Sequence, residues 1–421
     1  MAFRFVHTAD IHLDSPLKSL ALLNGELADL IGLASRQSFI QTIELCLEEQ
    51  VDALIIAGDL YDGEQTSMKT ARFLAEQLGR LHQGGIRTYI IRGNHDALSK
   101  ITAQLVMPDT VKVFGEIAER VTIERSGGDF DLAIHGMSFA KPHAPESLLR
   151  HFAAPVPGAV NIGIMHTSLG GSAGHDLYAP CSVVELRQAG FQYWALGHIH
   201  KRSALQDQSC AIVMPGIPQG RDINEDGSKT VSLVTVRDDR SILVEERRTA
   251  VAQFARLQID VSTASDWEDL VTLSKSQLGE LASAIPTSQI VARVEVTGTS
   301  ELAWRVRRDI DLLRTELETQ GSSIGNIWIE KVKVSSSPPR QNGANPGALG
   351  ELAAIIAREI HGSVDFNSEV KAIADELRGQ LPAELRDIIG KDQAAFDSLM
   401  AKFAKEGTAH VLALLQGAEG E

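Results

Sequence analysis

The sequence of 421 residues has few cysteines and no long apolar run, and each shortage excludes a class of protein. Its three cysteines, Cys46, Cys181 and Cys210, are widely spaced and odd in number, which fits neither a disulfide framework nor a zinc site. We therefore expect a reducing, cytoplasmic compartment. No apolar stretch approaches the roughly 18 residues needed to cross a bilayer, and the N-terminus lacks a signal-peptide pattern. We expect no membrane association.

Positive charge and aromatic residues are also scarce. The chain has 55 acidic residues against 40 basic ones, a net charge of −15. Non-specific DNA affinity comes mostly from Lys and Arg that neutralise phosphates, so we expect weak DNA binding by this chain alone, with a partner or a homodimer supplying the rest. Two bound divalent ions would restore about four positive charges at the place where a phosphate must lie. The aromatic residues, 5% of the chain, are scattered and are interpreted as core.

The length of 421 residues predicts two or three globular domains. Strands are expected at Phe3–Thr8, Asp52–Ala57, Ile86–Ile91, Val111–Phe114, Asp131–His135, Val160–His166, Tyr193–Leu196, Ala211–Met214 and Thr230–Val236. Helices are expected at Ser35–Gln50, Ser67–Gln83 and Cys181–Gln188, the last with Ser182 as its N-cap. Strands alternating with helices predict an α/β domain over residues 1–250, made of two sheets.

The remaining sequence changes in period. Residues 251–335 show a βαβαβ order, with a charged helix expected at 301–320, and predict a small α+β capping domain. Residues 336–348 are rich in Ser, Pro, Asn and Gly and predict a linker. Residues 349–421 have helical periodicity and predict a helical C-terminal segment.

Five polar motifs each follow a predicted strand, where open α/β sheets bind their ligands. They are Asp10-Ile11-His12, Gly58-Asp59, Gly93-Asn94-His95-Asp96, His166 and Gly197-His198-Ile199-His200. In the first and last motifs, residues i and i+2 point to the same side of a strand end, so each pair can hold one ion. Carboxylate, imidazole and one amide oxygen suit a pair of divalent transition metals.

The motifs also suggest individual roles. A carboxylate directly after a buried strand needs a partner, and Asp59 could bind two ions with its two oxygens. His95 is placed to act as an acid, and we expect Asp96 to orient its ring through a hydrogen bond. His175, in the glycine-rich loop after His166, is expected to line the pocket, whereas His135 is expected at the surface.

Each motif alone has an ordinary explanation: an exposed polar pair, a satisfied loop carboxylate, a turn or a polar strand terminus. All five, in this order and at successive strand ends, favour a two-metal phosphoesterase over these alternatives.

In this order the motifs resemble those of the calcineurin-like metallophosphoesterases. Longer stretches resemble SbcD-type DNA repair exonucleases, in particular their bacterial YhaO-like group. They are HTADIHLDSPL, AGDLYDG, IIRGNHD, MHTSLGG, YAPCSVVEL, YWALGHIH and PGIPQGRDINEDG. The resemblance covers about residues 1–250, is only topological for the cap and is weak beyond residue 345. It implies an α/β fold of four layers, with two mixed β-sheets sandwiched by helices.

The resemblance also implies the roles of the site residues. One metal would be held by Asp10, His12, Asp59 and His200, and the second by Asp59, Asn94, His166 and His198. His95 would protonate the leaving oxygen or stabilise the phosphorane during in-line attack on phosphorus, and Mn²⁺ is the usual ion. The chain departs from archaeal and eukaryotic relatives at Asp62, where they carry a histidine.

The expected function is that of a Mn²⁺-dependent DNA exonuclease of repair with an SMC-like ATPase partner, for which the C-terminal segment is the natural docking piece. The alternatives are a phosphodiesterase or phosphatase on non-DNA substrates, since the same metal site serves all of these, and a weakly active regulatory subunit of an ATPase complex.

Overall fold

The computed structural model of the chain describes residues 2–15, 25–62, 67–97, 107–124, 130–170, 178–339, 347–381, 386, 389–390 and 392–418. The described residues of 1–17 and 28–253 form a first compact unit, and those of 254–421 form most of a second. Part of the expected linker, residues 340–346, lies outside the described ranges. Among the described helices, none combines the length and the hydropathy needed to span a membrane.

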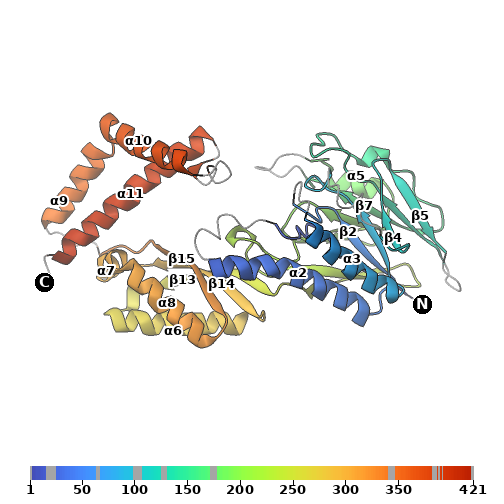
Figure 1. Cartoon of the computed structure of the whole chain (residues 1–421), viewed down its shortest axis with the longest axis horizontal. Coiled ribbons are helices and arrows are strands. Elements are labelled where there is room, and N and C mark those ends of the chain that lie inside the picture. Colours follow the sequence, from blue (N-terminus) through green and yellow to red (C-terminus); the bar gives the residue numbers. More distant parts are fainter. Residues whose placement is uncertain are drawn as a thin grey trace. The chain divides into compact units, whose positions relative to one another are not determined.

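The first unit contains two six-stranded mixed sheets (Figure 1). The first sheet has the order β12 (Ile242–Arg248), β11 (Thr230–Val236), β1 (Phe3–Thr8), β2 (Ala53–Ala57), β3 (Arg87–Ile91) and β4 (Val111–Val113). The second has the order β5 (Glu119–Ile123), β6 (Leu132–Gly136), β7 (Val160–His166), β8 (Tyr193–Gly197), β10 (Ala211–Met214) and β9 (Ser203–Gln206). Strands β1 to β4 run parallel to one another, as do β6, β7, β8 and β10. The outer strands β11, β12, β5 and β9 pair antiparallel.

Strand alternation builds four layers from these sheets. On β2, Ile55 faces a core between the two sheets, whereas Leu54 faces helices α2 (Gly25–Glu48) and α3 (Met68–Gln83). On the far side of the second sheet, Trp194 packs with Leu186 of α5 (Val183–Gln188). Since successive side chains of a strand point to opposite faces, each sheet has one face in the shared core and one under helices. The expected four-layer α/β fold is confirmed.

The second unit combines a small sheet with helices. Its sheet has the order β13 (Ala252–Asp260), β14 (Gln289–Thr297) and β15 (Ile327–Val334), and α6 (Trp267–Ala284) and α8 (Ile310–Ile324) share its apolar core. The helix expected over 301–320 is two helices, because Asp309 (φ −104°, ψ 35°) leaves the helical conformation between α7 (Ala303–Arg308) and α8. Beyond the sheet lie α9 (Gly347–Ile355), a π-helical turn (Ile356–Ile360), α10 (Val364–Gln380) and α11 (Gln393–Ala418).

Candidate metal centre

All five motifs meet at the carboxyl ends of β1, β2 and β3 in one sheet and of β7 and β8 in the other. The seven expected ligands lie together there, and Asp10, His12, Asp59 and His166 are fully buried. The ligand atoms of Asp10, His12 and His200 lie within 4.8 Å of one another, as do those of Asp59, His166 and His198. The seventh ligand, Asn94, places Oδ1 3.0 Å from Nε2 of His166. These two groups contain members of the two ligand sets that the family resemblance implies, and a third group, His12, Asp62 and His95, also has its ligand atoms within 4.8 Å of one another.

Glycines allow the two sheets to approach this closely. A Cβ atom on Gly93 would lie 2.3 Å from Oδ1 of Asp59, and one on Gly197 would lie 2.1 Å from the carbonyl oxygen of Ala57. Both are far inside van der Waals contact. The glycines that precede the Asn94 and His198 motifs are therefore required by the packing of the site.

The backbone of the ligands is strained. Asp10 (φ 53°), His12 (φ 46°), Asp59 (φ 51°) and His198 (φ 105°) all have positive φ, at a cost of about 1–3 kcal/mol for each non-glycine residue. Hydrogen bonds impose this geometry, since the backbone N–H of Asp10 donates to the carbonyl of Gly58 at 3.0 Å and that of His198 to both Asp10 carboxylate oxygens at 3.0 Å. All four strained residues are expected metal ligands. Their strain indicates that the fold holds the ligands in place before an ion binds.

The imidazole hydrogen bonds show what the site must bind. Nδ1 of His166 lies 2.9 Å from the carbonyl oxygen of Ala57, an acceptor, so Nδ1 carries the proton. Its Nε2 then points a lone pair at Oδ2 of Asp59 (3.2 Å) and Oδ1 of Asn94, two further acceptors. This arrangement is repulsive unless a cation, either a proton or a metal ion, lies among the three atoms.

His12 and His200 also bring ring nitrogens together at a point where a cation would be stabilised. Nδ1 of His200 donates to Oε1 of Glu225 at 2.6 Å, and its Nε2 faces Nε2 of His12 at 3.2 Å. Nδ1 of His12 is buried and has no hydrogen-bond partner within the described part of the chain. Metal-bound histidines commonly donate their second N–H to a carboxylate or carbonyl in this way. The donor set therefore fits divalent metal ions.

The pKa values of the ligands show the same demand for positive charge. Burial raises the pKa of Asp10 to about 6. Burial also opposes ionisation of Asp59, but the adjacent His166 and His12 hold its pKa well below the ordinary value. For His166, burial lowers the pKa and the charges of Asp59 and Asp10 outweigh it, so that the pKa is raised to about 9. These directions all favour positive charge among the ligand atoms.

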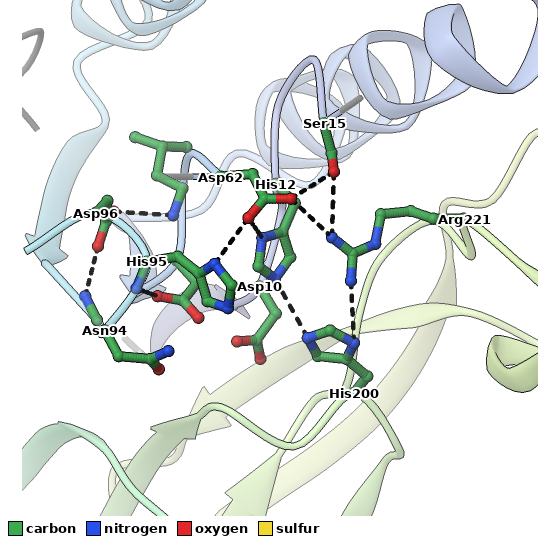
Figure 2. A network of polar contacts seen from close by, with 12 residues as sticks. Asp10, His12, Ser15, Asp62, Asn94, His95, Asp96, His200 and Arg221 are labelled. Carbon is green, nitrogen blue, oxygen red and sulfur yellow. Dashed lines mark hydrogen bonds and ion pairs between the residues drawn. The ribbon is translucent and has the colours of Figure 1, made fainter. Parts of the chain in front are cut away.

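The ring of His95 is oriented by Asp62 and not, as expected, by Asp96. Oδ1 of Asp62 lies 2.7 Å from Nδ1 of His95, and this hydrogen bond raises the pKa of His95 (Figure 2). The Asp96 carboxylate is buried and accepts the backbone N–H groups of Leu60 (2.9 Å) and Gly93 (2.6 Å). Asp96 thus ties together the loops that follow β2 and β3, and Asp62 takes over the predicted role.

Arg221 and Glu225 are functional candidates that the sequence patterns did not single out. Nη2 of Arg221 donates to Oε1 of Glu225 at 3.0 Å, and its Nη1 lies 3.5 Å from Oδ2 of Asp62. Figure 2 shows Arg221 between Asp62 and His200. The pair therefore links the ligand His200 to the carboxylate that orients His95. The only sequence signal was the stretch PGIPQGRDINEDG, which contains both residues.

A cleft of about 490 Å³ opens at these residues. It is lined by Asp59, Asn94, His95, Tyr178, His198, Ile199, His200, Lys201, Asp222, Asn224 and Glu225. The His95 side chain is 45% exposed, so a molecule that enters the cleft can reach its ring. His175, expected to line the pocket, lies outside the described residues. His135 is not at the surface as predicted, because its ring is buried against Phe191 and Nε2 contacts Oδ1 of Asn161 at 3.0 Å.

The sequence of the chain is similar to those of known proteins. The family model "Calcineurin-like phosphoesterase" matches residues 3–202, and "Metallophosphoesterase YhaO, middle domain" matches residues 254–337. The chain is 32% identical over 297 residues to the "Uncharacterized metallophosphoesterase YhaO" of Bacillus subtilis (strain 168), covering 70% of this chain and 72% of the relative.

Two more distant relatives are named "DNA double-strand break repair protein Mre11". The one from Sulfurisphaera tokodaii is 27% identical over 231 residues, covering 51% of this chain and 54% of the relative. The one from Methanopyrus kandleri is 25% identical over 291 residues, covering 63% and 61%.

Proposed function

Because the chain belongs to the calcineurin-like metallophosphoesterases and is therefore a metal-dependent hydrolase of phosphoesters, we propose that it is a Mn²⁺-dependent DNA exonuclease of repair. The observation that carries this proposal is the complete set of seven converging ligands with an exposed histidine beside them. The similarity of the chain to two DNA double-strand break repair proteins supports DNA as the substrate.

The residues of the chain each have a task in phosphodiester hydrolysis. Two divalent ions held by the seven ligands would supply Lewis acidity and neutralise charge at the phosphoryl group. His95 stands in the cleft with Nδ1 held by Asp62, so its Nε2 is free to give a proton to the departing oxygen. The pKa of His95 is raised, which keeps the ring in its acidic form to higher pH.

The donor set is compatible with Mn²⁺ as the ion. It combines the carboxylates of Asp10 and Asp59, the amide oxygen of Asn94 and four imidazoles. Oxygen-rich sites suit Mn²⁺ and Mg²⁺, whereas imidazole favours later transition metals. A mixed set that contains no thiolate is consistent with Mn²⁺ and argues against a zinc site of the cysteine type.

The C-terminal helices support a partner. Across α9 to α11 and the turn between them, nine large apolar side chains are at least 40% exposed: Ile355, Ile360, Val364, Ile373, Leu377, Phe403, Val411, Leu414 and Leu415. Exposed apolar surface of this extent is typical of a docking site. We propose that a coiled-coil, SMC-like ATPase covers it.

A nuclease assay on the full chain tests the function. End-labelled single- and double-stranded DNA, a chromogenic phosphodiester and a chromogenic phosphomonoester are each incubated with Mn²⁺, Mg²⁺ or a chelator. We expect stepwise shortening of DNA with Mn²⁺, little with Mg²⁺ and none with the chelator. The variant Asp59→Ala, purified in the same way, is the control for contaminating nuclease, and His95→Asn, which keeps the metal ligands, tests the role of His95.

Two results would contradict the proposal. Hydrolysis of the chromogenic substrates with DNA left intact would assign the site to a non-DNA phosphodiesterase or phosphatase. Full activity of His95→Asn would exclude His95 as the essential acid.

A further inference from the structure

The second unit contains a pocket of about 660 Å³ whose charge is opposite to that of the chain. It lies between β15, α7 and α11 and is lined by Glu295, Arg307, Ile310, Lys331, Val332, Lys333, Val334, Ser335, Lys402, Lys405, Glu406, Ala409 and His410. The lining contains four lysines and one arginine but only two carboxylates, although the chain as a whole carries a net charge of −15.

Most of these lysines form no ion pair with a described residue. Within the described part of the chain, Lys331, Lys333 and Lys405 form no ion pair, and Nζ of Lys402 lies 3.9 Å from Oε1 of Glu406. Burial lowers the pKa of Lys333, and the charges of Arg293, Lys402 and Lys331 lower it further, against the smaller opposing effect of Glu295. Lysines from a strand and a helix are thus held close enough to repel one another.

The spacing of the lysines indicates the shape of the ligand. Lys331 and Lys333 are alternate residues of β15, so they share one face of the strand roughly 6.6 Å apart. Lys402 and Lys405 are three residues apart on α11, which places them on one helix face. Two short rows of positive charge line one pocket, an arrangement that suits a linear anion with repeated charges better than a single compact ion.

Arg307 adds a fixed positive group. Its Nη2 donates to the carbonyl oxygen of Ser336 at 2.8 Å, and its guanidinium lies 5.9 Å from the ring centroid of Trp304. None of the described residues lining the pocket is Phe, Tyr or Trp, so the lining lacks a large platform for base stacking, and charge and hydrogen bonds would dominate recognition.

We propose that this pocket binds the phosphate backbone of single-stranded nucleic acid, independently of base sequence. The identification of the anion as nucleic acid rests on the proposed function, whereas the basic pocket itself does not. The site gives α11 a role in binding nucleic acid, distinct from docking of an ATPase.

Salt dependence of binding tests the proposal. The full chain, with metal chelated to prevent hydrolysis, is titrated into a dye-labelled single-stranded oligonucleotide at several salt concentrations, and anisotropy gives the affinity. Each phosphate neutralised on a single strand contributes about 0.7 to the slope of log affinity against log salt. We expect the double variant Lys333→Gln/Lys405→Gln to lower this slope by about 1.4, for two lost contacts.

Matched variants separate the pocket from overall charge. Lys69→Gln/Lys275→Gln removes the same charge from two exposed lysines of α3 and α6 that do not line the pocket, and it should leave the slope unchanged. Lys333→Arg/Lys405→Arg should keep the slope of the wild type. Circular dichroism melting of each variant establishes that the fold is retained.

Three results would overturn the proposal. The first is an equal slope of log affinity against log salt for the pocket variant and the control variant. The second is displacement of the oligonucleotide by a glutamate-rich peptide as effectively as by unlabelled DNA. The third is binding of tripolyphosphate at the pocket that the oligonucleotide cannot displace. Hydrolysis of the chromogenic phosphodiester, measured with metal on the same proteins, distinguishes the two failures. Active protein with equal slopes refutes only the pocket, whereas inactive protein with a reduced slope refutes only the proposed function.

Discussion

Replacement of Gly93 by alanine should damage the metal centre without changing any ligand. The new Cβ would lie 2.3 Å from Oδ1 of Asp59 and 2.8 Å from Cε1 and Nε2 of His166. Real Cβ atoms essentially never show contacts below 3.0 Å, so the carboxylate must shift by at least 0.7 Å, the difference between 3.0 and 2.3 Å. Asp59 and His166 are buried among the other ligands, so a shift of either side chain changes the ligand geometry. The strain therefore falls on the metal ligands.

The magnitude follows from this displacement. Overpacking of a filled interior costs about 1–3 kcal/mol. Disturbing the groups that hold metal ligands in place typically weakens binding about 10- to 100-fold. A misplacement of about 1 Å at reacting groups can cost about 100-fold in rate. We expect Gly93→Ala to stay folded, to bind at least one ion about 10- to 100-fold more weakly and to lose most hydrolysis.

Calorimetric titration with Mn²⁺ and metal content after dialysis measure this effect. The matched control is Gly79→Ala, because Gly79 lies inside α3 with no atom within 4 Å of its added Cβ, and alanine favours the helix by up to about 1 kcal/mol. The control should bind metal like the wild type and melt at the same or a higher temperature. If Gly93→Ala held two ions with unchanged affinity, the compact geometry assigned to this site would be wrong.

Four further predictions concern the same chain. Asp59→Ala should lose metal from both positions, and two ions still bound at full occupancy would refute its shared role. Glu225→Gln weakens the hydrogen bond to Nδ1 of His200, and Mn²⁺ affinity should fall about 10- to 100-fold, as titration would show. Because the pKa of His166 is raised to about 9 and the metal must displace that proton, apparent metal affinity should rise as the pH increases toward about 9; a flat pH profile would contradict this. Binding of DNA by the isolated chain should be weak at physiological salt, and tight binding would overturn the inference from the acidic composition.

Much of the fold and the site could be predicted because local patterns determine them. Parallel strands buried on both faces give continuous apolar runs, and the residues that follow such runs must lie at one edge of the sheet. The predicted cap of α5 is an example: Oγ of Ser182 accepts the N–H of Glu185 at 3.2 Å, and the Glu185 carboxylate accepts the N–H of Ser182 at 2.8 Å. A capping box needs only four consecutive residues.

Features that depend on distant residues escaped prediction. The strands β5, β9 and β12 lie at sheet edges or have exposed faces, so their sequences lack a strong apolar run. Asp96 directly follows His95 and was therefore chosen to orient its ring, whereas Asp62 reaches the ring from another loop. Likewise, Glu225 meets His200 only because a short 3₁₀ helix (Ile223–Glu225) lies beside the loop after β8.

The physical cost of the site shows that it is maintained for binding. Four ligands keep positive φ values at about 1–3 kcal/mol each, and burial raises the pKa of the ligand carboxylate of Asp10 to about 6. A sheet edge needed only for stability would gain by replacing these residues with apolar ones. Cations bound between the carboxylates offset the cost, because any ligand that binds only the folded state stabilises it. Thermal stability of the first unit should therefore depend on metal. The pocket of the second unit contains no buried carboxylate cluster, so the thermal stability of that unit should not depend on metal.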